Sequence, residues 1–467
     1  MQEAANWVID EANKACFGDK RLDKRYKNLL SEFSYTPDKS IPASFKSWSE
    51  TLAAYRFMNH KKVTHTRILS PHKEATLERI KGQKVVLVAQ DTTEMDFTKR
   101  KSMSGMGYLS KENSKGFYLH PSIALTPERC CLGVIDVQMW VREELGTREK
   151  RKKKPIEEKE TYCWVKSYEA ANQIALAAPE TTIVNVGDRE GDIYELLEKL
   201  PSEENKAYWL VRSSHNRSIL NDANQKFELR LREMVRKAEA IGHVEFKMSG
   251  GMSNRNSKSR HKREERNVYQ EVRICNITLR PPRRKEKKLE PISINVVHCK
   301  EINCPAGEEA LEWFLLTSFP VKDAEGALDI VQWYLCRWQI EVYFKVLKSG
   351  CKVEELQFDT FEATANCLAF YMIVGWRILY LTMLGRACPD MECSAVFEAS
   401  EWQSVYRIVK KEVPPKKPPK LNEMILMIAK LGGFLGRKSD GYPGTQVMWI
   451  GIQRMRDFTL AWEAFRS

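Results

Sequence analysis

Apolar positions recur at two different spacings along the chain, and each spacing predicts one kind of element. Through residues 1–75 they recur every three or four positions, as at Leu22, Tyr26, Leu29, Leu30 and Phe33. This spacing places them on one face of a helix, so the segment predicts a helical unit. The opposite face carries cations: Lys20, Arg21, Lys24, Arg25 and Lys27.

Short continuous apolar runs follow this unit and predict buried strands. The runs before residue 200 are 84–90, 122–125, 131–140 and 181–186. The pattern from about 208 to 318 is mostly β, with strands expected at 208–211, 268–279, 292–298 and 313–316. Between them, the polar stretch 253–266 is rich in Ser, Lys and Arg and predicts a hairpin tip.

Helical spacing returns at 193–200 and dominates the chain after residue 324. Residues 324–349 predict one long helix, on which side chains three, four and seven positions apart share a face. That face would carry Tyr334, Arg337, Glu341, Lys345 and Lys348. The longest apolar stretch, 367–385, contains Arg377 and is short for a membrane span, so it predicts a buried helix.

Composition narrows the class of protein. A chain of 467 residues is too long for one compact core, so roughly two to four domains are expected. With 43% hydrophobic and 29% charged residues it is globular material and not a disordered chain. The formal charge of +13 favours polyanionic partners, namely DNA, RNA or an anionic membrane surface.

The cysteines and the N-terminus indicate a cytoplasmic protein. The twelve cysteines include no Cys-x-x-Cys pair, so no zinc-ligand spacing is present and reduced thiols are expected. Residues 1–14 carry acids and no apolar core, which does not fit a signal peptide. We expect a location in the cytoplasm and no membrane partner.

Three acids are candidates for chemistry. Asp91 and Asp188 each follow an apolar strand, and sites in α/β sheets form at the carboxyl ends of strands. An Asp in this place is also a common cap or turn residue, and Glu341 could belong to a salt-bridged surface helix. Glu190 and Asp192 lie close to Asp188, which we prefer because it directly ends the strand.

Three carboxylates suit the hydrolysis of a phosphodiester. Two divalent ions about 3.5–4 Å apart stabilise charge on the attacking and leaving oxygens. Carboxylate oxygens select Mg²⁺, with Mn²⁺ as a substitute. We therefore expect two Mg²⁺ ions at Asp91, Asp188 and Glu341. Phosphates would be held by Tyr334, Arg337, Lys345 and Lys348.

Several motifs resemble one family. The spacing Tyr334, two residues, Arg337, three residues, Glu341, six residues, Lys348 is specific. Other motifs, in chain order, are Gly18-Asp19-Lys20-Arg21 with Arg25, Ala54-Tyr55-Arg56-Phe57, Asp91-Thr92-Thr93, Gly187-Asp188-Arg189-Glu190-Gly191-Asp192 and the segment 311–318. Over nearly its whole length the chain resembles the bacterial Asp-Asp-Glu (DDE) transposases of the insertion-sequence-four type, above all their Tn-five branch.

The resemblance implies an α/β fold: a ribonuclease-H-like catalytic domain with a β-rich insertion, flanked by helical N- and C-terminal domains. The implied domains are 1–75 for binding DNA ends, 76–380 for catalysis, with the insertion at about 208–318, and 381–467 for dimerisation. Arg21 and Arg25 match the end-binding helix, and Arg212 matches a DNA-contact position. Trp313 matches a position that receives a flipped base, although its apolar strand equally suits a core residue.

The implied activity is cut-and-paste transposition by a homodimer on double-stranded DNA. It comprises binding of transposon ends, metal-dependent hydrolysis, hairpin formation and strand transfer into target DNA. Two alternatives stay open: a catalytically silent, transposase-derived DNA-binding regulator, and a structure-directed nuclease of the same fold.

Overall fold

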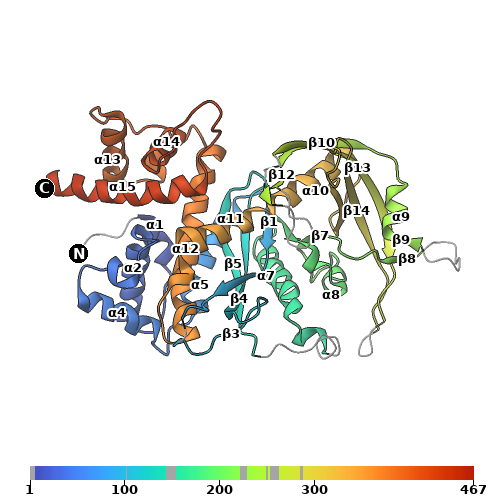
Figure 1. Ribbon diagram of the computed structural model, residues 1–467, viewed down its shortest axis with the longest axis horizontal. Coiled ribbons are helices and arrows are strands. Elements are labelled where there is room, and N and C mark those ends of the chain that lie inside the picture. Colours follow the sequence, from blue (N-terminus) through green and yellow to red (C-terminus); the bar gives the residue numbers. More distant parts are fainter. Residues whose placement is uncertain are drawn as a thin grey trace. The chain divides into compact units, whose positions relative to one another are not determined.

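The computed structural model describes residues 6–100, 102–143, 154–220, 229–248, 251–252, 262–263, 265–283 and 288–466. The chain forms two compact units (Figure 1). Unit 1 comprises Met1–Pro155 and Trp338–Ser467, and unit 2 comprises Ile156–Arg337. Each unit combines strands and helices, so the chain is a mixed α/β protein with helical flanks.

Unit 1 begins with helices: α1 (Asn6–Ala12), α2 (Lys20–Tyr35), α3 (Ile41–Ser44), α4 (Trp48–Met58) and α5 (His65–Lys81). The side chain of Asp19 caps α2 by accepting from the N–H of Arg21. Tyr26, Leu29 and Phe33 are buried, as the helical spacing predicts. The helical interpretation of this segment is therefore confirmed.

The sheet of unit 1 is built around one strand. Its members are β1 (Val85–Gln90), β2 (Thr93–Asp96), β3 (Gly107–Tyr108), β4 (Lys115–Leu125) and β5 (Cys131–Trp140). β4 pairs antiparallel with each of the other four. The predicted strands 84–90 and 131–140 are confirmed. β4 begins before the predicted 122–125 because its first half includes Lys115, His120 and Pro121, which interrupt the apolar run.

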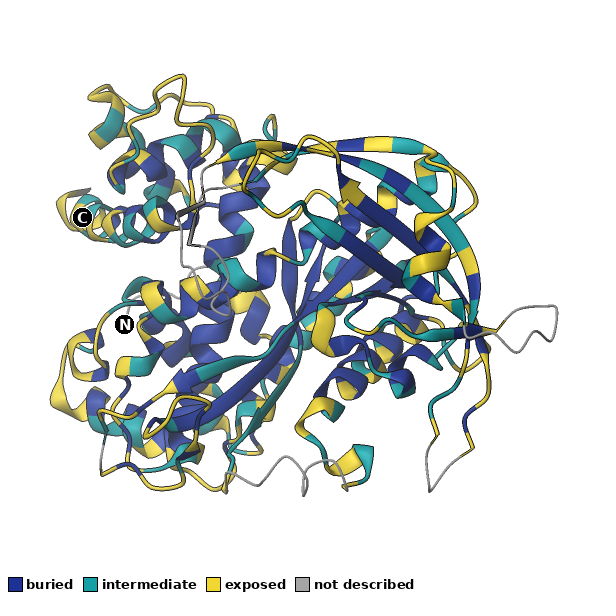
Figure 2. Cartoon of the chain, turned by 45° about the vertical axis from the view of Figure 1, so that its right-hand side comes forward, coloured by how far each residue is buried: buried dark blue, intermediate teal, exposed yellow. Residues whose placement is uncertain are grey.

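A long helix, α12 (Phe361–Ala387), passes through the core of unit 1. It packs against α2, α5, β5, α14 and α15, and Figure 2 shows it almost entirely buried. By length and composition it could cross a membrane, but 89% of its most apolar window is buried inside the protein. The prediction of a buried helix at 367–385 is confirmed.

The C-terminal part of unit 1 is helical. Its elements are α13 (Ala399–Lys410), α14 (Leu421–Leu431) and α15 (Thr445–Arg466). Trp402, Met424, Ile428 and Met448 belong to a cluster of buried side chains that these helices share with the end of α12. Apolar packing therefore joins this segment to the rest of unit 1.

The strands of unit 2 follow the order β6-β7-β15-β14-β13-β8-β9, with β10 also paired to β13. β6 and β7 pair in parallel. The strands are β6 (Thr182–Gly187), β7 (Tyr208–Arg212), β8 (Ser218–Leu220), β9 (Leu229–Arg230), β10 (Gly242–Met248), β13 (Arg266–Leu279), β14 (Ile292–Glu301) and β15 (Glu312–Thr317). Each strand predicted for this region is present.

The helices of unit 2 are α7 (Cys163–Ala177), α8 (Tyr194–Leu197), α9 (Leu231–Arg236) and α10 (Ala324–Cys336). The helix predicted at 193–200 is thus confined to α8. Of the predicted hairpin tip at 253–266, residues 253–261 and 264 lie outside the described residues. Next to them, β11 (Gly251–Met252) pairs with β12 (Lys262–Arg263).

The prediction of one helix over 324–349 is wrong. α10 ends at Cys336, α11 covers Gln339–Lys345, and a π-helix, η4, covers Val346–Gly350. The N–H of Arg337 bonds to Tyr334 O and that of Glu341 bonds to Trp338 O, three residues back instead of four. A π-helix also has more residues per turn than an α-helix. The predicted row of side chains on one regular helix face therefore does not exist.

Candidate active site

Asp91 lies in the short connection between β1 and β2. Gln90, the last residue of β1, faces Ser122 in β4, and Thr93, the first of β2, faces Leu119 in the same strand. Asp91 is half-buried, and its Oδ1 accepts a hydrogen bond of 2.8 Å from the N–H of Thr92. Asp91 therefore lies at the carboxyl end of the buried strand β1.

A histidine that sequence analysis missed binds both neighbours of Asp91. His120 Nδ1 lies 2.7 Å from Thr92 Oγ1, and His120 Nε2 lies 2.9 Å from Gln90 Oε1. His120 and Gln90 are fully buried. Burial lowers the pKa of His120 to about 3, so its ring is neutral.

Glu341 belongs to α11, which packs against β1. The helix that carries this half-buried acid therefore covers the strand that ends at Asp91. Lys348 in η4 donates from Nζ to Glu94 O at 2.5 Å and lies 3.4 Å from Glu354 Oε1. The contact with Glu94 ties η4 to β2, just after Asp91. Lys345 is exposed.

In unit 2, Asp188 directly follows β6. Its Oδ1 accepts a 2.7 Å hydrogen bond from the N–H of Glu190 and so caps the short 3₁₀ helix Arg189–Gly191. Partial desolvation, and then the like charge of Asp188, raise the pKa of Glu190. Asp188 is thus held as a capping residue at the strand end, which is one of the roles its sequence position predicts.

Arg212 is the last residue of β7, and its guanidinium interacts electrostatically with the Tyr334 side chain of α10. Burial lowers the pKa of Arg212, and burial raises that of the Tyr334 phenol. The charges of Arg337 and Asp188 both act on Tyr334, and that of Arg189 acts on Arg212. Unit 2 therefore gathers one carboxylate, three guanidinium groups and a phenol.

Trp313 in β15 is enclosed by aromatic rings. Phe246 stacks on it at 5.4 Å between centroids, and Tyr334 meets it edge-on at 5.6 Å. Only 8% of Trp313 is exposed. The indole is thus packed as part of the core in this structure, and a base could stack on it only if Phe246 moved.

Asp192 is a structural carboxylate. Its side chain accepts from the N–H groups of Ser214 and His215 at 2.8 and 2.9 Å. Arg217 binds the other oxygen through Nε at 2.9 Å and Nη2 at 2.6 Å. The side chain is fully buried. Asp192 therefore anchors the loop 213–217, which begins directly after Arg212.

The two arginines that match the end-binding helix, Arg21 and Arg25, differ in their surroundings. Arg21 is 92% exposed and pairs with Asp19 at 3.2 Å. Arg25 is half-buried on the same helix. Lys20 and Lys24 beside them are exposed, so α2 presents a cationic face opposite its buried one.

The predicted carboxylates are divided between the units. Unit 1 carries Asp91 and Glu341, and unit 2 carries Asp188. Within the described residues of either unit, no three His, Cys, Asp or Glu side chains form a metal-binding group.

Three family models match successive parts of the chain. The model for transposase DNA-binding matches residues 4–63, that for the transposase DDE domain matches 161–374, and that for the transposase Tn5 dimerisation domain matches 373–466. The DDE match contains Asp188 and Glu341, whereas Asp91 lies outside it.

One solved structure is also similar: the cryo-EM structure of the piggyBac transposase synaptic complex with hairpin DNA. The likeness covers 90% of this chain and 80% of that chain, at 9% identity and a TM-score of 0.30. A likeness at this level carries no argument about the fold or the reaction.

The order of a DNA-binding, a DDE and a dimerisation segment defines a DNA transposase, which binds DNA, forms dimers, and cleaves and joins DNA with divalent metal ions. The chain belongs to the Tn5 and insertion-sequence-four type of DDE transposases.

Proposed function

We propose that Asp91, Asp188 and Glu341 are the catalytic carboxylates of a ribonuclease-H-like domain and that they hold two Mg²⁺ ions. Their donor atoms are all carboxylate oxygens, the ligands that Mg²⁺ and Mn²⁺ prefer. The imidazole of His120, which binds both neighbours of Asp91, has both ring nitrogens engaged by Gln90 and Thr92, so it is not an additional ligand. The donor set therefore fits the ions.

One observation supports this site above the others: Arg212 and Tyr334 act on each other electrostatically, and the charge of Asp188 acts on the same phenol. A guanidinium has five N–H donors, so Arg212 can bind the phenol and also a phosphate oxygen. Arg337 adds a second guanidinium near the same phenol. A carboxylate flanked in this way suits a phosphodiester whose charge is shared between metal ions and arginines.

The bound ions would stabilise negative charge on the attacking and leaving oxygens of an in-line displacement at phosphorus. Side chains of the protein bind and orient the phosphates. Tyr334, Arg337 and Arg212 orient the scissile phosphate, and Lys345 and Lys348 hold neighbouring phosphates. Trp313 receives a base once Phe246 has moved aside.

The same displacement serves each step. Water attacks one strand at the transposon end and releases a 3′-hydroxyl. This hydroxyl attacks the opposite strand to form a hairpin, and a second water opens it. The 3′-hydroxyls then attack target DNA and displace its strand oxygens. Because every step exchanges one oxygen for another at phosphorus, one site suffices.

The remaining roles follow the segment order. Residues 1–75 bind transposon ends through the cationic face of α2, including Arg21 and Arg25, in a salt-dependent manner. Residues 76–380 form the catalytic domain with the β insertion at about 208–318, and residues 381–467 join two copies in the synaptic complex. The enzyme works in the bacterial cytoplasm on nucleoid DNA.

A cleavage assay tests the proposal. The protein is incubated with a labelled duplex of its own element's end sequence, with Mg²⁺, with Mn²⁺ or with neither. We expect 3′-hydroxyl ends and hairpins only with metal, and none from Asp91→Ala, Asp188→Ala or Glu341→Ala, all of which still bind the duplex. Asp329→Asn, an exposed acid on α10, is the matched control and should cleave normally. Cleavage by any of the three alanine variants would remove that acid from the site.

A further inference from the structure

We propose that His120 is a positioning residue for the reaction: it fixes the Asp91 carboxylate by holding the residues on both sides of it. The inference rests on the proposed role of Asp91. It concerns a residue of β4 that no motif singles out, and that lies in the partner strand and not in the loop that carries the acid.

The two hydrogen bonds define the state of the imidazole. Gln90 Oε1 can only accept, so His120 Nε2 carries the proton and donates it. Nδ1 is then the acceptor for the hydroxyl of Thr92. A neutral imidazole has one donor and one acceptor nitrogen, and here each is used once.

The bonds act on Asp91 through its neighbours. His120 holds Gln90, which precedes Asp91 in the chain, and Thr92, which follows it. The N–H of Thr92 donates directly to Asp91 Oδ1 at 2.8 Å. The chain of contacts therefore runs from the imidazole through the Thr92 side chain to the Thr92 backbone and on to one oxygen of Asp91. Asp91 Oδ1 is oriented as long as Thr92 stays in place.

Burial strengthens the hydrogen bonds of His120 and so limits the movement of Gln90 and Thr92. His120 and Gln90 are both 0% exposed, so water does not compete for their hydrogen bonds. Carboxylate ligands need to be held close to their binding geometry before the ions arrive, and groups one step behind the ligands commonly do this. A purely structural histidine would affect folding and leave the affinity for divalent ions unchanged.

The experiment measures ion binding apart from cleavage. Mn²⁺ is titrated into the full-length protein on its end duplex, and bound Mn²⁺ is followed by electron paramagnetic resonance. We expect His120→Leu to raise the half-saturating Mn²⁺ concentration about tenfold or more. Duplex affinity should be unchanged. His120→Asn, which places an amide near Nδ1, should recover part of the loss.

A second variant keeps the test independent of folding. Thr92→Val removes one hydroxyl at a half-buried position and should also raise the half-saturating concentration. Because both changes break the same contact, Thr92→Val combined with His120→Leu should be no worse than His120→Leu alone. If His120→Leu fails to fold by circular dichroism, Thr92→Val alone decides, and wild-type ion binding by it overturns the proposal.

Two control variants distinguish the role of His120 from the role of Asp91 as a metal ligand. His298→Leu removes an equally buried histidine of β14 in unit 2 and should leave Mn²⁺ binding unchanged. If Asp91→Asn loses Mn²⁺ while the His120 and Thr92 variants bind it as the wild type does, His120 is not a positioning residue and the carboxylate site stands. If Asp91→Asn itself binds Mn²⁺ normally, Asp91 is not a ligand and both proposals fail.

Discussion

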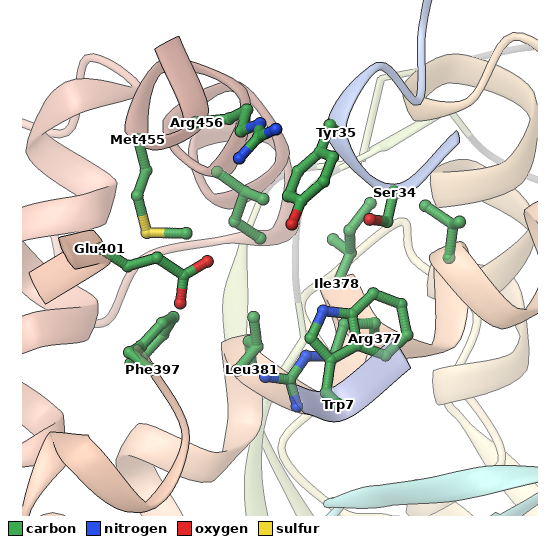
Figure 3. A pocket seen from close by; sticks show the side chains of 12 residues that line it. Trp7, Ser34, Tyr35, Arg377, Ile378, Leu381, Phe397, Glu401, Met455 and Arg456 are labelled. Carbon is green, nitrogen blue, oxygen red and sulfur yellow. The ribbon is translucent and has the colours of Figure 1, made fainter. Parts of the chain in front are cut away.

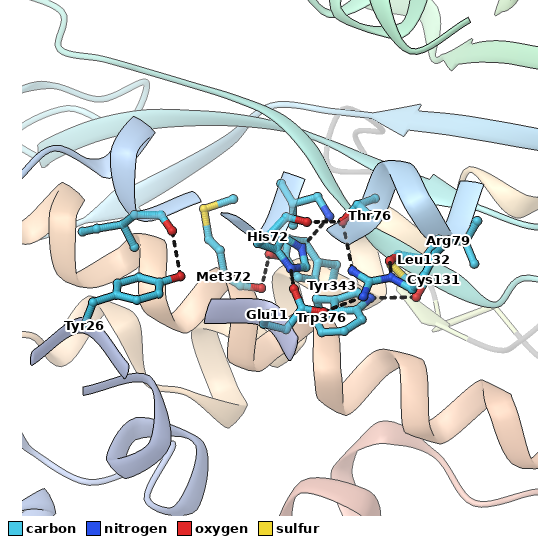
Figure 4. Close-up of polar contacts among 12 residues, drawn as sticks. Glu11, Tyr26, His72, Thr76, Arg79, Cys131, Leu132, Tyr343, Met372 and Trp376 are labelled. Atoms are coloured by element: carbon cyan, nitrogen blue, oxygen red, sulfur yellow. Dashed lines mark hydrogen bonds and ion pairs between the residues drawn. The ribbon is translucent and has the colours of Figure 1, made fainter. Parts of the chain in front are cut away.

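His72 Nδ1 lies 2.5 Å from Glu11 Oε2, and both side chains are buried in unit 1 (Figure 4). The N–H of Val134 donates to the other ring nitrogen, Nε2, at 3.0 Å, so the proton of a neutral His72 is on Nδ1 and points at Glu11. Arg79 binds the second oxygen of Glu11 at 2.5 Å and lies 4.3 Å from the Trp376 ring centroid. One carboxylate thus ties α1 to α5.

Removing Glu11 should strongly destabilise unit 1. Glu11→Ala leaves Arg79 and His72, both largely buried, without their acceptor, and breaking such a buried pair costs about 3 kcal/mol. We expect a lower unfolding temperature in calorimetry and faster hydrogen exchange in α1. Glu74→Gln, which breaks an exposed pair with Lys14 at 3.2 Å, is the control and should change little. Equal effects of the two variants would contradict the role of the buried cluster.

The same cluster should make the protein sensitive to acid. Burial lowers the pKa of His72 below its ordinary 6.5, although Glu11 opposes this. Burial raises the pKa of Glu11, but His72 and Arg79 outweigh it and bring the pKa below 4.5. In both cases the unfolded chain takes up a proton at a higher pH than the folded protein does. Stability is therefore lost as the pH falls, first below about 6.5 through His72 and then below about 4.5 through Glu11.

Unfolding temperatures between pH 7.5 and about pH 5 check this prediction, since only the histidine contribution falls in that range. The wild type should lose stability across it more steeply than His72→Gln, which has no proton to gain there. Parallel curves for the two proteins would show that His72 is not the source.

The positions of Asp91 and Asp188 could be predicted because each ends an apolar run, and the run alone predicts a buried strand. The contacts around them could not. His120 lies 30 positions from Gln90, and only the register of β4 against β1 brings the two together. Glu11 and His72 are 61 positions apart. No local spacing indicates pairs of this kind.

The helix break at Arg337 also could not be predicted from the sequence. Neither Gly nor Pro occurs near it, and Arg337 and Trp338 both keep right-handed helical dihedral angles. Trp338 is 62% exposed, so an apolar side chain at the break does not mark the core. Hydrogen bonding, and not residue type, ends α10 there.

Asp192 should behave as a loop anchor and not as a metal ligand. In Asp192→Asn the charge opposite Arg217 is lost and an NH₂ group faces backbone donors, at a cost of about 3 kcal/mol. We expect faster hydrogen exchange at 213–217 and unchanged Mn²⁺ binding. Glu190→Gln, at an exposed position of the same motif, should leave exchange in that loop as it is. Loss of Mn²⁺ from Asp192→Asn with a protected loop would reverse the assignment.

A small cavity of about 40 Å³ in unit 1 connects the first and last matched segments (Figure 3). Trp7 lines it from α1 and Glu401 from α13, with Arg377 of α12 between them in sequence. Arg377 donates to Val396 O at 3.1 Å and lies 5.2 Å from the Trp7 ring centroid. Burial lowers the pKa of Arg377 to about 10, so it stays charged at neutral pH, and burial raises the pKa of Glu401.

These two charges should be energetically coupled, because the charge of each acts on the other's pKa. We expect Arg377→Met and Glu401→Gln each to lower stability, and the double variant to lose about 1 kcal/mol less than the sum. Gln at 401 can still accept the N–H of Glu398, so the helix cap is preserved. Hydrogen exchange should rise in α1 and α13 together in Arg377→Met, because Trp7 loses the cation beneath its ring. Strict additivity, with exchange altered in only one of these helices, would mean that the cavity does not link the two segments.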